Sequence, residues 1–225
     1  MTEANVHTWA LIPVKDFAAA KGRLADVLAP ADRSALAEAM LRDVIAALDA
    51  AKGISGISLV GGADARRIAK ECDLNWLVER EPSGLNAALN MGANELEQQG
   101  LGSVLILPDD LPTLTGPDIT ALLDEHTGGL SVSPATNDGG TNALLISPPN
   151  AIAFQYGRDS ARRHLQAGLA AGLPARTVCL PAFNRDIDQP DDLQWLRTQR
   201  PGQHTADVLS AIDRGSLLSA AAVQG

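Results

Sequence analysis

Short apolar runs alternate with segments of helical period along almost the whole chain, and this alternation limits the possible folds more than any other feature. Strands that alternate with helices are typical of a mostly parallel sheet covered by helices on both faces. The expected strands are residues 9–14, 57–60, 75–78, 104–107, 130–133, 142–147 and 177–180. One expected helix begins near 30–34 and ends near 53. The others are 64–71, 85–96, a segment capped by Thr115, 160–171 and 189–199. We therefore predict an α/β fold.

The chain shows no internal repeat and no low-complexity linker, so its 225 residues fit one large domain. We place this domain at residues 1–199. Residues 200–225 are rich in Ala, Ser and Gly, which predicts a loosely docked C-terminal tail.

The charge balance excludes several classes of partner. The net charge is −9, whereas a broad nucleic-acid surface needs an excess of basic residues. No apolar stretch approaches the roughly 20 residues that span a membrane, and the first residues lack a signal-peptide pattern. Cys72 and Cys179 lie far apart, which favours free thiols. We expect a cytoplasmic protein with no nucleic-acid or membrane partner.

Ligands of such sheets bind at the carboxyl ends of the strands, so we examined the loops that follow each predicted strand. The first loop carries Lys15, Lys21 and Arg23 in an otherwise acidic chain. Converging cations can hold a polyphosphate, and Gly22 allows close approach of backbone. The alternative is an ordinary solvated loop. A Walker-type loop is excluded, because its Gly-Lys-Ser/Thr ending is missing.

Two pairs of carboxylates follow later strands. Asp109 and Asp110 end the strand at 104–107, and Asp186 and Asp188 alternate in a loop, so that in extended backbone they face one side. Mg²⁺ prefers such oxygen ligands and often uses one or two carboxylates together with substrate phosphates. Turn formation or capping explains Asp109 and Asp110 equally well, and Asp188 could simply cap the helix near Pro190.

Three further segments suit phosphate or nucleotide. Residues 84–86 open a helix, where free amides favour anions. Residues 138–142 form a Gly-Gly turn that would expose backbone donors, or a plain hairpin. Ser160, Arg163 and His164 could hold a phosphorylated acid, or form an ordinary basic helix face. Together these loops fit one reaction, in which a phosphate attacks the α-phosphorus of a nucleoside triphosphate on Mg²⁺ and pyrophosphate leaves.

The ordered set of these motifs resembles the 2-phospho-L-lactate guanylyltransferase family of deazaflavin coenzyme (F420) biosynthesis, whose relatives also use phosphoenolpyruvate or 3-phospho-D-glycerate. The resemblance covers residues 9–196. The motifs that carry it are residues 12–15, 21–24, 84–89, 108–112, 140–145, Gly157 with Ser160, Arg163 and His164, and 186–188 with Pro190. It implies a single-domain, Rossmann-like nucleotidyltransferase fold of the glycosyltransferase-A type, with GTP and a small phosphorylated carboxylic acid as partners and Mg²⁺ as cofactor.

The resemblance also implies roles for individual residues. The catalytic set is Lys21, Arg23, Asp110 and Asp188. The nucleotide would be bound by Lys15, Lys21, Arg23, Gly84, Leu85, Asn86, Thr141 and Asn142. The phospho-acid would be bound by Thr141, Gly157, Ser160, Arg163 and His164. The metal would be held by Asp110 and Asp188, helped by Asp109 or Asp186.

Relatives often have Ala in place of Asp109, which puts that ligand in question. A transferase for another acceptor, such as a molybdenum-pterin cofactor, is the alternative enzyme, and a nucleotide-binding regulatory module is the alternative from another class. The oligomeric state stays open, although relatives are often dimers.

Overall fold

The computed structural model describes residues 8–78 and 84–223, with the backbone alone at 216–223. The strands are β1 Thr8–Val14, β2 Ile54–Gly61, β3 Asn75–Val78, β4 Ser103–Ile106, β5 Gly129–Pro134, β6 Thr141–Ser147 and β7 Ala175–Thr177. The α-helices are α1 Pro30–Asp49, α2 Ala63–Glu71, α3 Leu85–Gln98, α4 Gly116–Glu125, α5 Ser160–Ala170, α6 Pro190–Leu196 and α7 Gln203–Val223. Short 3-10 turns are η1 Phe17–Ala19, η2 Gly22–Leu24 and η3 Pro181–Phe183.

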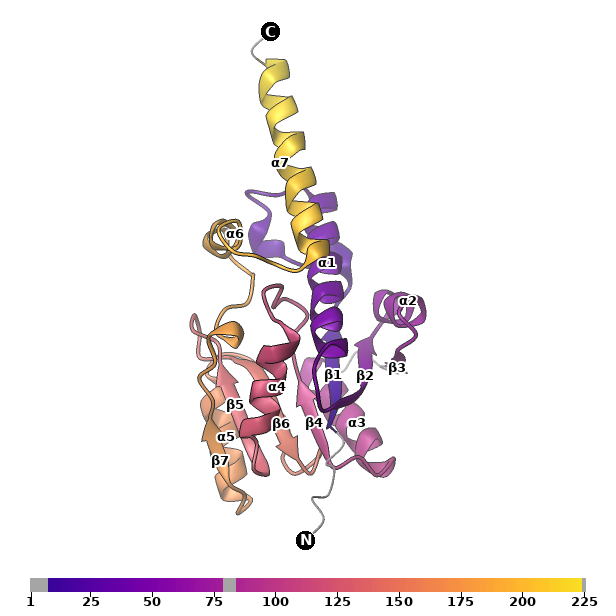
Figure 1. The fold of residues 1–225 in the computed structure, drawn as a ribbon, viewed down its shortest axis with the longest axis vertical. Helices are drawn as coiled ribbons and strands as arrows, with labels where there is room; N and C mark the ends of the chain where they lie inside the picture. Colours follow the sequence, from indigo (N-terminus) through magenta and orange to yellow (C-terminus); the bar gives the residue numbers. More distant parts are fainter. Residues whose placement is uncertain (1–7, 79–83, 224–225) are drawn as a thin grey trace.

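The described strands form one seven-stranded sheet in the order β3-β2-β1-β4-β6-β5-β7 (Figure 1). Strand β1 pairs in parallel with β2 and β4, whereas β6 runs antiparallel to both β4 and β5. The predicted α/β fold with a mostly parallel, mixed sheet is therefore confirmed. Because β6 is reversed, its first residues lie at the edge where β1, β4 and β5 end.

One expected strand is displaced. We predicted a last strand at 177–180, but β7 occupies Ala175–Thr177 and pairs with Leu130–Val132 of β5. The ladder ends where the amide of Val178 donates to the carbonyl of Val132 at 2.9 Å. Pro181 then begins η3, which turns the chain away from the sheet.

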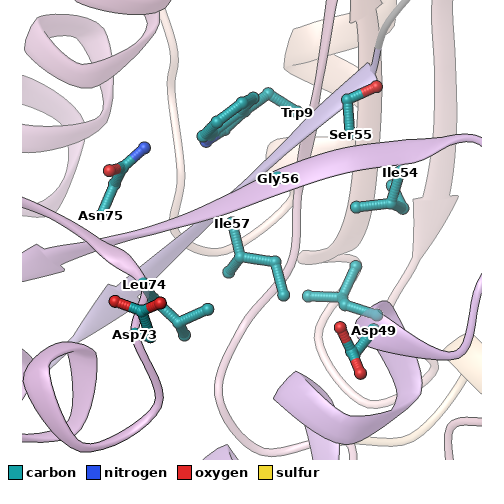
Figure 2. A pocket seen from close by; sticks show the side chains of 10 residues that line it. Trp9, Asp49, Ile54, Ser55, Gly56, Ile57, Asp73, Leu74 and Asn75 are labelled. Atoms are coloured by element: carbon teal, nitrogen blue, oxygen red, sulfur yellow. The ribbon is translucent and has the colours of Figure 1, made fainter.

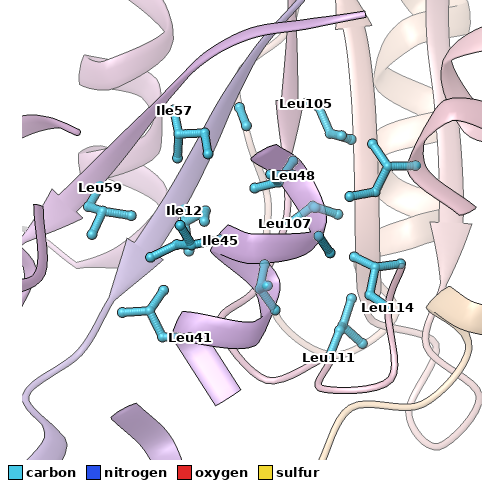
Figure 3. Close-up of a cluster of buried hydrophobic side chains, with 14 of the residues drawn as sticks. Ile12, Leu41, Ile45, Leu48, Ile57, Leu59, Leu105, Leu107, Leu111 and Leu114 are labelled. Carbon is cyan, nitrogen blue, oxygen red and sulfur yellow. The ribbon is translucent and has the colours of Figure 1, made fainter. Parts of the chain in front are cut away.

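Apolar clusters cover both faces of the sheet. On one face α1, α2 and α4 pack over β1 and β4, with Ile12 and Leu48 among the residues without exposed surface (Figure 3). On the other face α3 and α5 pack over residues such as Leu11 and Leu144. Alternate residues of β1 thus enter opposite clusters, as strand geometry requires. Within the described parts of the chain, no helix combines the length and apolar character that crossing a bilayer would need.

A third cluster joins the C-terminal helix to α1. Leu36 and Met40 of α1 are fully buried against α6 and α7. Leu209 of α7 is 6 % exposed in the same cluster. The carboxylate of Asp43 accepts hydrogen bonds from the amides of His204 at 3.0 Å and Thr205 at 2.8 Å, which caps α7. Helix α7 then runs alongside α1 and extends beyond it (Figure 1). The packed core therefore continues past residue 199, the boundary placed from composition.

Candidate active site

Three loops meet at the carboxyl edge of the sheet. The cation loop (residues 15–25) follows β1, the β4 loop (residues 107–112) follows β4, and the carboxylate loop (residues 184–189) precedes α6. Strands β1 and β4 are parallel neighbours, so the first two loops necessarily leave the sheet side by side. The amide of Ile187 donates to the carbonyl of Asp110 at 3.2 Å, which brings in the third loop.

Lys21 and Asp110 form the central ion pair of this edge. The Nζ atom of Lys21 lies 2.5 Å from Oδ2 of Asp110, and the two side chains are 8 % and 16 % exposed. Burial lowers the pKa of Lys21, but the charges of Asp110, Asp109 and Asp188 outweigh it and raise the pKa above its ordinary value. Lys21 therefore stays a cation. The other oxygen of this carboxylate, Oδ1, is buried without a hydrogen-bond partner.

In the carboxylate loop, Asp186 and Asp188 flank a buried residue, and that their side chains face one side stays a prediction. Ile187 has no exposed surface and anchors the loop in the third cluster, between Asp186 and Asp188. Asp188 forms an ion pair with Arg23 of the cation loop. The side-chain amide of Asn142 donates to Oδ1 of Asp186 at 3.4 Å. The structure thus brings both acids of this loop toward Asp110 and the cation loop.

Negative charge exceeds positive charge among these side chains. Burial, followed by repulsion from Asp110, raises the pKa of Asp109 to about 6. The same two causes, in the same order, raise the pKa of Asp186 above its ordinary value. Lys15 opposes the shift of Asp109, which places this lysine within electrostatic range of the acids. A bound cation would relieve this repulsion.

The donor set fits Mg²⁺ if substrate phosphates complete the coordination. Among the described residues, no three His, Cys, Asp or Glu side chains are grouped closely enough to hold a metal ion by themselves. Mg²⁺ commonly keeps one or two carboxylates, waters and phosphate oxygens, so such a group is not required. The unpartnered, buried Oδ1 of Asp110 is an oxygen donor of the kind that this ion prefers.

The start of β6 connects the carboxylates to a second polar region. The side-chain amide of Asn142 donates to the carbonyl of Phe183 at 2.8 Å, and Asn142 is 5 % exposed. The hydroxyl of Thr141 lies 2.9 Å from the hydroxyl of Ser160 and 3.1 Å from Nδ1 of His164. Thr141 and Asn142 therefore lie between the carboxylate loop and the N-terminus of α5.

His164 is buried inside this second region. Its Nε2 accepts a hydrogen bond from the amide of Gln155 at 2.9 Å, and its Nδ1 faces Thr141. Burial and then the charge of Arg163 lower its pKa to about 4, so the ring is neutral at pH 7 with the proton on Nδ1. Both ring nitrogens are satisfied within the protein. Contact of Ser160 and His164 with a phospho-acid stays a prediction, since neither side chain is exposed.

The surface of this region is formed by the turn into α5. Gly157 has φ +126° and Asp159 has φ +55°, so the backbone turns sharply before Ser160. A terminal nitrogen of Arg163 donates to the carbonyl of Gln155 at 2.9 Å, while Nε of the same side chain is buried without a partner. These features leave the glycine exposed and the guanidinium partly so.

The start of α3 is tied to the same turn. The side chain of Asn86 accepts from the amide of Tyr156 at 2.6 Å and donates to its carbonyl at 3.3 Å. Gly84 and Leu85 are exposed at the first turn of α3, and Gly84 has φ +87°. The predicted nucleotide segment thus lies beside the predicted acid segment, on the face covered by α3 and α5.

Sequence reasoning missed two carboxylates that hold these loops. Asp64 of α2 accepts from the amide of Phe17 in the cation loop at 2.9 Å. Asp192 of α6 accepts from the amides of Asp188 and Gln189. We had considered Asp188 as the cap of this helix, whereas Asp192 closes the capping box. The spacing of Asp192 three residues after Gln189 is that of a capping box, but Gln and Asp are not the residue types of its usual sequence signature.

Two hollows are not lined by Lys21, Asp110 or the acids of the carboxylate loop. One of about 310 Å³ lies at the start of β2, where Trp9, Ile54 and Asn75 are among the residues that line it (Figure 2). This is the edge opposite the cation loop, because β1 begins there. Another of about 350 Å³ lies behind the cation loop, between Phe17, Glu38 and Arg67.

Comparisons with known proteins identify the relatives of this chain. The chain is 38 % identical over 219 residues to the phosphoenolpyruvate guanylyltransferase of Conexibacter woesei, covering 93 % of this chain and 98 % of that one. It is 35 % identical over 207 residues to the 3-phospho-D-glycerate guanylyltransferase of Phenylobacterium zucineum, covering 89 % and 94 %.

Solved structures show the same fold at low sequence identity. A Desulfovibrio desulfuricans protein assigned to the nucleotide-diphospho-sugar transferases aligns with a TM-score of 0.74 at 17 % identity, over 92 % of this chain and 95 % of that one. The family described as guanylyl transferase CofC like matches residues 8–215, which include all three loops. The chain therefore belongs to the CofC-like family of guanylyl transferases.

Proposed function

We propose that this protein transfers GMP from GTP to the phosphate of a three-carbon phospho-acid, in the biosynthesis of the deazaflavin coenzyme F420. A phosphate oxygen of the acid forms a bond to the α-phosphorus, the bond from the α-phosphorus to the bridging oxygen of the β-phosphate breaks, and pyrophosphate leaves. The product joins GMP to the acid through a phosphoanhydride. An ionised phosphate is itself the nucleophile, so this transfer needs no general base.

The observation that carries the proposal is the juxtaposition of Lys21 with Asp110 at the carboxyl edge of the sheet. Lys21, together with Lys15 and Arg23, would neutralise the triphosphate and the leaving pyrophosphate. Asp110 and Asp188, with Asp109 or Asp186, would hold Mg²⁺. When bound, this ion would supply charge neutralisation at the reacting phosphates. Catalysis is then a matter of position and charge.

The two remaining regions would divide the other substrate groups between them. Gly84, Leu85 and Asn86, with Thr141 and Asn142, would bind the guanosine. Thr141, Gly157, Ser160, Arg163 and His164 would form the acid site. Because His164 is buried and bonded to Thr141, its contribution would be to hold that hydroxyl in place. Arg163, which is partly exposed, would pair with a charged group of the acid.

The names of the relatives narrow the choice of acceptor. Those relatives act on phosphoenolpyruvate or 3-phospho-D-glycerate, so we expect one of these two acids in preference to 2-phospho-L-lactate. We also propose that the protein works in the cytoplasm, where both substrate classes are made. We also propose that the protein is a homodimer, because relatives in the family are often dimers. Light scattering of the purified protein tests this assembly.

The test is pyrophosphate release with GTP and Mg²⁺, measured in parallel with each of the three acids. The next enzyme of the pathway is coupled to the assay, so that an unstable product does not hide turnover. Release that depends on one acid supports the proposal and names the acceptor. If folded protein that binds GTP releases no pyrophosphate with any of the three acids, the acceptor class is refuted and another acceptor, such as a pterin cofactor, is favoured. Absence of GTP binding would refute the nucleotide assignment itself.

A further inference from the structure

Asp192 is an almost completely buried carboxylate beside the proposed metal site. It is 1 % exposed and occupies the third position of α6. A buried carboxylate is costly unless hydrogen bonds and opposite charge compensate for lost water. The hydrogen-bond partners of the Asp192 carboxylate therefore indicate its role.

Its two oxygens contact different segments. Oδ2 accepts from the amide of Gln189 at 2.8 Å and from the amide of Asp188 at 3.2 Å. Oδ1 accepts from Nε of Arg185 at 2.8 Å and lies 3.5 Å from the side-chain amide of Asn137. Burial opposes ionisation, but the amide of Gln189 and the guanidinium of Arg185 keep the pKa of Asp192 below its ordinary value.

A capping role alone does not require this set of contacts. Helix α4 has the same capping box, in which Asp118 accepts from the amide and hydroxyl of Thr115, its own N-cap residue. Asp192 makes the equivalent contact with Gln189 and then reaches further, to Asp188, Arg185 and the loop that contains Asn137. The additional contacts all lie in segments that border the proposed site.

The amide held by Asp192 belongs to a residue whose side chain is proposed to bind metal. A backbone contact at Asp188 limits the movement of residues 186–188, since Ile187 is already bonded to the carbonyl of Asp110. The carboxylates of Asp186 and Asp188 are then held beside Asp110 at two backbone points. Without Asp192, their position would depend on the contacts of Ile187 and on the side-chain contacts of Asp188 with Arg23 and of Asp186 with Asn142.

We propose that Asp192 is a positioning residue that holds the Asp186 and Asp188 carboxylates against Asp110, and that it does so through Arg185 and the amide of Asp188. The inference rests on the function proposed above, because it concerns the Mg²⁺ and triphosphate site. It assigns Asp192 no contact with substrate or metal.

The test compares Asp192→Asn with Asp118→Asn. The asparagine at 192 keeps the shape and one acceptor, but it loses the charge and turns an N–H group toward Arg185 or the amides. The change at 118 alters the matching carboxylate of a helix whose N-terminus packs at Ala50, the other end of α1. Helix α4 follows the β4 loop, but the hydrogen bonds of Asp118 among the described residues go to Thr115 and not to the carboxylate loop.

The first readout is the Mg²⁺ concentration that gives half-maximal pyrophosphate release at saturating GTP and acid. We expect it to rise about tenfold in Asp192→Asn, the usual effect of one lost charge-assisted hydrogen bond. The second readout is hydrogen exchange of the Asp188 and Gln189 amides without any ligand. We expect it to become about tenfold faster in Asp192→Asn, and to be unchanged in Asp118→Asn.

The two readouts separate the inference from the function on which it rests. If wild-type protein releases no pyrophosphate, the proposed function fails, and exchange together with Mg²⁺-dependent binding of GTP still decides the role of Asp192. Asp192→Glu, which restores the charge, is expected to regain part of the Mg²⁺ response. If Asp192→Asn keeps wild-type amide protection and wild-type Mg²⁺ dependence, Asp192 is only a helix cap and the inference is overturned.

Discussion

Oδ2 of Asp110 accepts a hydrogen bond from Nζ of Lys21 at 2.5 Å, whereas Oδ1 of the same carboxylate is buried without a hydrogen-bond partner. One carboxylate thus neutralises a lysine and retains a donor atom for a cation. Burial, and then repulsion from Asp110, raises the pKa of both Asp109 and Asp186. The pair is consequently both a structural contact and the part of the site most sensitive to substitution.

Asp110→Asn is expected to lower kcat at least about 100-fold, a common effect of removing one preorganised charge from an active site. Asp124→Asn, which removes an exposed charge from α4, is the matched control and is expected to keep wild-type kcat. The measurement is pyrophosphate release at saturating substrates, with circular dichroism to confirm folding. Turnover within threefold of wild type would remove Asp110 from the metal site.

The stability of the Lys21–Asp110 pair is expected to be strongly non-additive. Lys21→Met leaves the carboxylate of Asp110 among other acids without its cation. This variant should lower the free energy of unfolding by about 2–4 kcal/mol, which is a larger loss than the one expected for Asp110→Asn. The double variant removes both charges and should be more stable than Lys21→Met alone. Urea unfolding at pH 7 measures all four proteins. A double variant whose loss equals the sum of the two single losses would contradict this coupling.

The contribution of His164 to stability is expected to be lost as the pH falls from 6.5 to 4. Burial, followed by Arg163, lowers its folded pKa to about 4 from the ordinary value near 6.5, so the unfolded chain takes up a proton in this window that the folded protein does not. The free energy of unfolding then rises with pH, by about 3 kcal/mol across the whole window.

A second histidine contributes to the same pH response. His126 bonds Ser131 and Ser147, and burial followed by Arg176 lowers its pKa to about 4 as well. His164→Gln should therefore remove the contribution of one histidine and leave that of His126, while Asp109, whose folded pKa is raised to about 6, contributes with the opposite sign in both proteins. Urea midpoints measured between pH 7 and pH 4.5 test this. An unchanged slope in the variant would show that His164 does not titrate as expected.

Gly202→Ala is expected to destabilise the protein, because a Cβ atom there would lie 2.3 Å from Cγ of Asp43. Overpacking of this kind costs about 1–3 kcal/mol, and here it also displaces the carboxylate that caps α7. Gly215→Ala is the matched control, since no atom lies within 4 Å of its Cβ position and the residue is inside the same helix. It should be neutral or stabilising by up to about 1 kcal/mol. Equal stabilities of the two variants would show that α7 is not fixed at Asp43.

Much of the fold was predictable because the relevant signals are local. The helical period from Leu36 to Leu48 and the apolar runs at β1 and β4 each need only neighbouring residues to recognise. The rule that ligands bind where parallel strands end then brought Lys21 and Asp110 to one edge. The order of the sheet, and the reversal of β6, depend on contacts between distant segments.

What could not be predicted depends on the third cluster and on buried carboxylates. Leu36 and Met40 have the same helical spacing as the residues that face the sheet, so periodicity alone does not reveal that they pack against α6 and α7. Composition placed residue 200 onward outside the domain, because it carries no information on Asp43, a residue 161 positions before His204. Roles for individual binding residues stay predictions, since no ligand defines them.

The docking of α7 onto α1 also sets an order of events during synthesis. The amides that Asp43 caps lie 161 and 162 positions later in the chain. At about 5–20 residues per second, roughly 10–30 s pass between translation of Asp43 and of its partners. Throughout this interval Leu36 and Met40 have no lasting cover, although the sheet-facing side of α1 can already pack. The seam along α1 therefore closes only after the residues of α7 have been made, and a chain truncated before His204 would leave it open.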